Sequence, residues 1–159
     1  MIVTDKDGSL VNPERLTIEE LLPHRGRMKL VDEILQLDDE VAVTAATATR
    51  KWPLFDGRAI SPVVLVELVA QTAGIKNGLD RIRSQGPGAD KRGWLVGIKQ
   101  ARFAVDAIFP GDRIVTRAWN AYQLETYFNI EGEATRDSTV IGRVSLQAIQ
   151  AFAAAEGQG

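Results

Sequence analysis

A single carboxylate within an apolar stretch is the residue of this sequence best suited to chemistry. Glu67 is the only charged residue between Arg58 and Lys76, and valines and leucines flank it on both sides. Burying an isolated charge is costly, so such a carboxylate must be hydrogen-bonded or held neutral with a raised pKa. We interpret Glu67 as a general acid or base beside a tunnel. The alternative is a structural carboxylate that caps a neighbouring strand or a subunit interface.

Two nearby positions extend Glu67 into a narrow stripe. Gln71 and Gly74 follow it at spacings that place all three residues on one face of a helix. The rest of that helix segment is strongly apolar. We therefore expect Gln71 and Gly74 to contact a substrate that reaches Glu67.

Two other titratable residues are candidates for a second catalytic group. His24 is the only histidine and lies at a turn beside Arg25. Such a histidine is more often structural or exposed, and a catalytic role would require a partner subunit to bring Glu67 near it. Asp56 lies in an irregular segment, where aspartate commonly forms a turn by binding backbone N–H groups. The alternative for Asp56 is a second carboxylate that works with Glu67.

The start of the same helix offers a group that can polarise a carbonyl. Ser61 and Pro62 form a strong helix-start signal, with a hydroxyl cap followed by proline. The backbone N–H groups near Val63 and Val64 are then predicted to be free, at the positive end of the helix dipole. They can polarise a thioester carbonyl or an enolate oxygen, although every helix has such an end.

The elements that position these side chains are one long helix and a sheet. The helix is predicted to run from Ser61 to about Ser84, with an apolar, buried first half and an amphipathic second half that reaches solvent. A short helix is expected to begin at Thr17. Residue patterns predict strands at 28–35, 41–49, 93–103, 112–124, 126–135 and 140–152. Together they predict an α+β fold in which an antiparallel sheet wraps around one central helix.

Length and composition favour one ordinary globular domain. The chain has 159 residues, of which 45% are hydrophobic and 25% charged. We expect an N-terminal arm and short helix in residues 1–20, a single domain in 21–152 and a flexible tail in 153–159. No apolar stretch approaches the length of a membrane span, and no secretory signal is evident. A cytoplasmic protein is expected.

Several classes of function are excluded by residue counts. Zero cysteines exclude disulfide scaffolds, thiol catalysis and cysteine-ligated metals, and one histidine excludes poly-histidine metal sites. We therefore expect no metal and no cofactor. A formal net charge of −2 lacks the basic footprint of a nucleic-acid-binding protein.

Several short motifs resemble, in order and spacing, those of FabA/FabZ-type 3-hydroxyacyl-[acyl-carrier-protein] dehydratases. The resemblance extends over about residues 21–152. The first two segments resemble the LPHR…LVD opening of that family, the third its E-x-x-A-Q-x-x-G helix, and the others a strand and turn. The matching segments are Leu22-Pro23-His24-Arg25, Leu30-Val31-Asp32, Glu67-Leu68-Val69-Ala70-Gln71 with Gly74, Trp94-Leu95-Val96-Gly97-Ile98, Ala101-Arg102-Phe103 and Pro110-Gly111-Asp112.

The resemblance implies a hotdog fold whose active sites lie between paired subunits. In that family a histidine from the loop before the central helix works with a helix carboxylate of the other subunit. Glu67 falls on the carboxylate position, whereas the loop 55–62 contains no histidine. The family's Pro-Gly at the helix start corresponds to Pro62-Val63 here. The chain is thus more similar to divergent hotdog dehydratases, some linked to aryl polyene or polyketide-like pathways.

Three functions follow as expectations. The first is a dehydratase-like enzyme acting on 3-hydroxyacyl thioesters of acyl carrier protein or coenzyme A, in a homodimer or higher oligomer. Glu67 would act as acid or base, and His24 or Asp56 would supply the second group. The second is a non-catalytic acyl-binding subunit that pairs with an active hotdog partner. The third is a hotdog thioesterase with a carboxylate-activated water.

Overall fold

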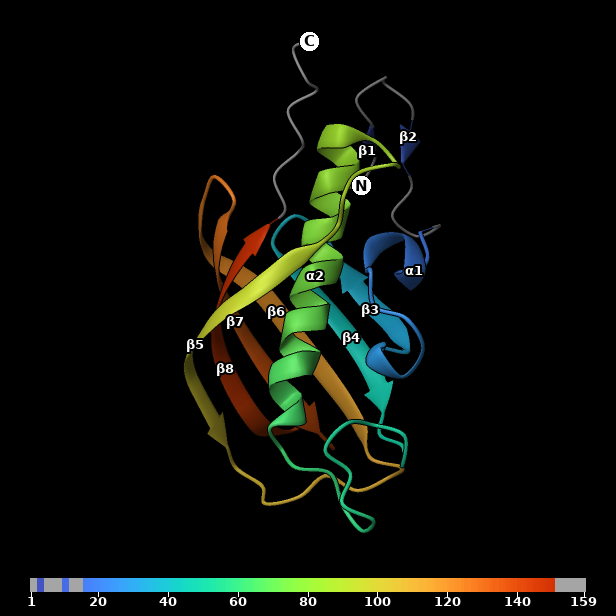
Figure 1. Ribbon diagram of the computed structural model, residues 1–159, viewed down its shortest axis with the longest axis vertical. Coiled ribbons are helices and arrows are strands. Elements are labelled where there is room, and N and C mark those ends of the chain that lie inside the picture. Colours follow the sequence, from blue (N-terminus) through green and yellow to red (C-terminus); the bar gives the residue numbers. More distant parts are fainter. Residues whose placement is uncertain (1–2, 5–9, 12–15, 151–159) are drawn as a thin grey trace.

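One long helix, α2 (Val64–Gln85), lies along one face of a six-stranded antiparallel sheet (Figure 1). The computed structural model describes residues 3–4, 10–11 and 16–150. In spatial order the strands are β3 (Glu33–Leu37), β4 (Val41–Thr47), β6 (Arg113–Leu124), β7 (Tyr127–Arg136), β8 (Thr139–Gln150) and β5 (Gly93–Phe103). The predicted α+β architecture is confirmed.

The N-terminal region contributes small elements. Within the predicted arm, β1 (Val3–Thr4) pairs with β2 (Leu10–Val11). The helix expected at Thr17 is α1 (Ile18–Leu21), and a capping box holds its start: the Glu20 N–H donates to the Thr17 hydroxyl, and the Thr17 N–H donates to the Glu20 carboxylate. The predicted tail, 153–159, lies outside the described residues.

The strand predicted at 28–35 begins later than expected. A single 3₁₀ turn, η2 (Gly26–Met28), precedes it, and regular pairing starts only at Glu33. The reason is that the side chain of Gln71 on α2 binds the Met28 carbonyl and the Leu30 N–H. The backbone of Met28 and Leu30 therefore bonds to the central helix α2 instead of to a neighbouring strand, and the Leu30 side chain is buried.

The two layers approach closely because small residues face large ones. A Cβ at Gly132 of β7 would lie 2.3 Å from a methyl carbon of Val69, and one at Gly142 of β8 would lie 2.7 Å from Leu65. On the other side, a Cβ at Gly78 would lie 2.1 Å from the carbonyl oxygen of Leu21 in α1. Glycine at these positions lets α2 pack directly on the sheet and on α1.

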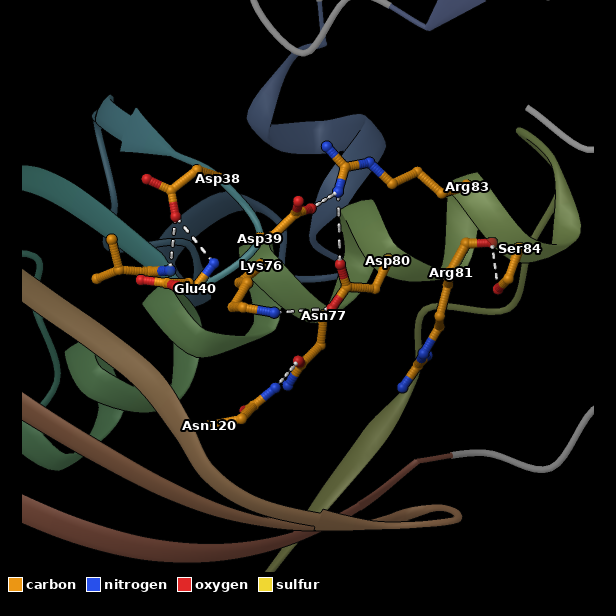
Figure 2. Close-up of polar contacts among 11 residues, drawn as sticks. Asp38, Asp39, Glu40, Lys76, Asn77, Asp80, Arg81, Arg83, Ser84 and Asn120 are labelled. Atoms are coloured by element: carbon orange, nitrogen blue, oxygen red, sulfur yellow. Dashed lines mark hydrogen bonds and ion pairs between the residues drawn. The ribbon is translucent and has the colours of Figure 1, made fainter. Parts of the chain in front are cut away.

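The second half of α2 is more buried than its charges predict. Lys76 and Arg81 are only 5% and 6% exposed, so the expectation that this half reaches solvent is wrong for them. Lys76 pairs with Asp80 at 2.8 Å, and Arg83 pairs with Asp39 in the β3–β4 turn (Figure 2). These polar partners allow the charged residues to pack against the sheet. Within the described parts of the chain, no helix is long and apolar enough to cross a bilayer.

Candidate active site

Glu67 and His24 of the same chain meet at one end of a cavity. Glu67 lies in the first turn of α2, and His24 lies between α1 and η2. The distance from His24 Nε2 to Glu67 Oε1 is 3.3 Å, and each side chain is 34% exposed. The contact that was expected to need a partner subunit therefore forms within one chain.

The turn that carries His24 is held by its neighbour Arg25. The guanidinium of Arg25 donates to the backbone carbonyls of Glu19, Leu22 and His24, at 2.8, 2.5 and 2.9 Å. These bonds join α1 to the following segment and fix the backbone from which the imidazole projects. The Arg25 side chain beside His24 is thus structural.

Gln71 connects Glu67 to the segment around η2. Its side-chain N–H₂ group donates to Glu67 Oε1 at 2.8 Å and to the Met28 carbonyl at 2.6 Å, and its oxygen accepts from the Leu30 N–H at 2.9 Å. Gln71 is fully buried and is not part of the cavity wall. Its geometry suits positioning of the carboxylate, in contrast to the substrate contact expected from its spacing.

The hydrogen bonds decide the ionisation of Glu67. Burial raises the pKa of its carboxyl, but the hydrogen bonds from His24 and Gln71 together outweigh burial, and the net pKa is lowered. Of the two states expected from sequence, the hydrogen-bonded one is correct and the raised pKa is wrong. Glu67 is therefore an anion at neutral pH. Among the described residues, both donors act on Oε1, which leaves Oε2 available to a ligand.

The imidazole of His24 has one engaged nitrogen and one that is not. Nε2 faces the Glu67 carboxylate, whereas Nδ1 is buried and has no hydrogen-bond partner within residues 16–150. At 3.3 Å, Nε2 and the Glu67 carboxylate are close enough to share a proton. The pair can hold and move one proton between Nε2 and the carboxylate.

The cavity beside this pair runs between α2 and the sheet. It encloses about 150 Å³ in the single chain. Glu67, Ala70, Gly74, Asn77 and Arg81 line it along one face of α2. Apolar side chains line the opposite, sheet side: Leu95 of β5, Phe128 and Ile130 of β7, and Leu146 and Ala148 of β8. Gly74, which was expected to contact a substrate, lies in this lining, and the contact itself stays a prediction.

The other predicted site residues lie away from this cavity. The N–H of Val63 donates to the Ser61 hydroxyl and that of Val64 to the Ser61 carbonyl, so these donors are already occupied. Asp56 is exposed, and its carboxylate accepts from the N–H groups of Arg58 and Ala59 at 2.8 and 2.9 Å. These bonds lower the Asp56 pKa and show the turn-forming role. Within residues 16–150, no hydrogen bond joins the Asp56 carboxylate or the N–H groups of Val63 and Val64 to the Glu67 carboxylate.

Sequence reasoning missed two cavity residues, Asn77 and Arg81. Both continue the helical spacing that starts at Glu67 and includes Gly74. Extending the stripe by two more turns was the signal that could have found them. Their charge and polarity instead suggested a solvent-facing surface.

Comparison with known proteins decides the family. A family model described as ApeP-like, ApeP dehydratase, matches residues 16–156. The chain belongs to the ApeP-like dehydratase family. It is also 29% identical, over 141 residues, to a 3-hydroxyacyl-[acyl-carrier-protein] dehydratase FabZ of Streptococcus pneumoniae strain CGSP14, covering 86% of this chain and 94% of the relative.

Solved structures confirm the hotdog fold of this ApeP-like chain. The dehydratase heterocomplex ApeI:P from Xenorhabdus doucetiae aligns with a TM-score of 0.76 and 24% identity, over 86% of this chain and 92% of that one. A hypothetical thioesterase with coenzyme A from Streptococcus pneumoniae TIGR4 aligns with a TM-score of 0.56 and 15% identity, over 75% and 84%. At these identities the likeness concerns the fold alone.

Proposed function

We propose that this protein dehydrates 3-hydroxyacyl thioesters, carried by acyl carrier protein or coenzyme A, with Glu67 and His24 as its acid–base pair. The 3.3 Å contact between these side chains at the end of a cavity is the observation that carries the proposal. Membership of a dehydratase family and similarity to FabZ support the reaction class. No cofactor enters the proposed reaction.

The proposed reaction uses the two side chains on opposite halves of the elimination. Glu67 Oε2 removes the α-proton of the thioester, and the electrons of that C–H bond form the C=C bond. The C–O bond to the β-hydroxyl breaks, and protonated His24 gives its Nε2 proton to the hydroxyl, which leaves as water. Glu67 is then protonated and His24 neutral. Proton transfer across their contact restores the starting pair.

Substitution of the carboxylate tests this proposal. In Glu67→Gln, the rate of hydration of a 2-enoyl thioester should fall at least about 100-fold, because no base remains. The rate is measured as the loss of the absorbance of the conjugated double bond. The matched control is Glu33→Gln, which alters an exposed carboxylate on the edge strand β3. Undiminished turnover in Glu67→Gln would remove this residue from the chemistry.

A second candidate function is that of one subunit in a mixed hotdog assembly. The loop 53–62 contains no histidine, and a solved structure similar to this chain is described as a dehydratase heterocomplex. In such an assembly this chain would supply an acyl-binding wall or Glu67, and the partner would supply the remaining group. Co-purification from the native host separates the two, since a stoichiometric second hotdog chain favours the mixed assembly.

The same substrate assay also distinguishes a thioesterase. A 3-hydroxyacyl thioester should form a double bond without release of free thiol if the protein is a dehydratase. Thiol release without a double bond would instead indicate that Glu67 activates water. Running several acyl lengths on both carriers in this assay also identifies the preferred substrate.

A further inference from the structure

The cavity that starts at Glu67 continues along α2 to a second polar end. Glu67, Gly74, Asn77 and Arg81 line it in succession, and at 1.5 Å per residue Arg81 lies about 21 Å along the helix axis from Glu67. Between the two ends the sheet contributes apolar side chains. The cavity is therefore apolar in the middle and polar at both ends.

Arg81 at the second end is a buried cation held only by neutral oxygens. Its NH1 donates to the carbonyls of Asp90 at 2.5 Å and Arg92 at 3.0 Å. When the Gln150 amide is oriented with its oxygen toward Arg81, that oxygen accepts from Nε and NH2 at 2.9 and 3.2 Å. The carboxylate of Asp90 binds Arg92 instead. Within the described parts of the chain, no carboxylate lies within ion-pair distance of Arg81. A buried guanidinium of this kind favours an additional acceptor.

Two more donors share this end of the cavity. The side-chain oxygen of Asn77 accepts a hydrogen bond from the Asn120 side chain at 2.7 Å. This leaves the amide N–H₂ group of Asn77 as a donor on the cavity wall. Figure 2 shows Asn77 and Arg81 pointing to the same side of α2, away from Arg83. Lys91 adds an ammonium group to the lining. Among the described residues, Glu67 at the opposite end is the only carboxylate in the lining.

We propose that this second end binds an oxygen-bearing group, a carboxylate or a hydroxyl, at the far end of the acyl chain. The inference rests on the proposed function, which places the thioester at Glu67. The hydrocarbon of the chain then lies on the apolar middle of the cavity. A terminal methyl would offer no acceptor to the Asn77 side-chain amide N–H₂ group or to the Lys91 ammonium, so polar-ended chains bind preferentially.

The phosphate of the carrier's pantetheine arm is also an anion that these donors could bind. To reach them, the arm would have to enter the cavity from the Lys91 end. The lining between the two ends argues against it, because the amides of a pantetheine arm would lack partners on this apolar wall. The acyl chain is therefore the better occupant. The experiment below separates the two sources.

The test measures binding without chemistry. The ligands are S-alkyl pantetheine thioethers of matched length that end in methyl, hydroxyl or carboxylate and carry neither phosphate nor 3-hydroxyl. Calorimetry on the full chain, with its partner if one co-purifies, should show the carboxylate-ended or hydroxyl-ended ligand binding at least about 10-fold more tightly than the methyl-ended one. Glu67→Gln should keep this ratio, so the result stands or falls separately from catalysis.

Two variants and one control locate the preference. Asn77→Leu and Lys91→Met should each reduce the ratio of polar-ended to methyl-ended affinity about 3-fold or more. Lys99→Met, an exposed lysine of β5 outside the cavity, should keep the ratio. Arg81 is kept because its bonds tie α2 to the start of β5. Equal affinity of wild type for all three ligands, or an unchanged ratio in both variants, would overturn the proposal. A gain on adding a 4′-phosphate that is lost in Lys91→Met would assign the site to the carrier arm instead.

Discussion

Glu67 receives both of its hydrogen bonds on one carboxylate oxygen, and Gln71 supplies one of them. In Gln71→Met this bond is lost while the volume is nearly kept. The pKa of Glu67 should rise, because burial is then opposed by His24 alone. The acid limb of kcat/KM against pH should move up by about one pH unit, the equivalent of one charge-assisted hydrogen bond. An unshifted limb would contradict the positioning role.

The same carboxylate contributes to stability in a defined pH window. Because folding lowers the pKa of Glu67 from 4.5, its contribution is fully present above that value and is lost as pH falls through the lowered pKa. Gln71→Met should also cost about 1–3 kcal/mol of unfolding free energy, since the Met28 carbonyl and Leu30 N–H lose their partner. Urea titrations at neutral and acidic pH measure both effects.

His24 gives the second prediction at the residue scale. His24→Ala should lower kcat about 100-fold or more with little change in KM, because the proton donor is lost and the cavity remains. Added imidazole should restore part of the activity, which a purely structural role would not allow. Arg27→Ala, an exposed change in the neighbouring turn η2, is the matched control.

If Glu67→Gln abolishes turnover and His24→Ala does not, the second proton comes from another group. A partner chain in the mixed assembly is then the better explanation. Activity of the purified single chain in wild type would in turn argue against that source.

The residue types alone made both members of this pair candidates but did not predict their contact within one chain. Glu67 could be found because its charge interrupts an apolar helix, a local signal. Its contact with His24 depends on how α1 and η2 pack on α2, which no local pattern encodes. The free N–H groups expected near Val63 and Val64 failed for a similar reason, since Ser61 folds back to occupy them.

At the scale of elements, glycine positions set the distances between layers. Gly78→Ala should lower the free energy of unfolding by about 1–3 kcal/mol or more, because the new methyl would lie 2.1 Å from the Leu21 carbonyl and must displace α1. Since α1 leads into the turn that carries His24, activity should fall as well. Gly88→Ala, where a Cβ meets no atom within 4 Å, is the control in thermal and urea unfolding.

Element types were largely predictable, and their limits less so. Alternating side chains were enough to predict the strands of the sheet, and the long apolar segment was enough to predict α2. The segment 28–35 was misassigned because a side chain, Gln71, takes the backbone bonds that a strand would make. Lys76 was placed in solvent because its burial depends on how α2 packs on the sheet, although its partner Asp80 lies one turn along the same helix. The partners of Arg81, the carbonyls before β5, become neighbours only after folding.

For the whole molecule, the decisive feature is the unpaired edge of the sheet at β5. Four large apolar side chains on this strand are exposed in the single chain: Trp94, Leu95, Val96 and Ile98. Trp94 and Leu95 also line the cavity that contains Glu67. An edge strand with this composition favours pairing with another strand. A partner on β5, whether a second copy or another hotdog chain, would therefore enclose the cavity.

The last prediction concerns this edge. Ile98→Lys should prevent assembly, because a charge replaces an apolar side chain beside unpaired backbone groups. Sedimentation should then show a single chain where wild type is paired, and dehydration should weaken mainly through KM, since the cavity loses a wall while Glu67 and His24 stay in contact. Leu35→Lys places the same charge on β3, the opposite edge, where an apolar side chain is also exposed. Leu35→Lys should keep both assembly and activity. If Leu35→Lys dissociates and Ile98→Lys stays assembled, the interface lies at β3 instead.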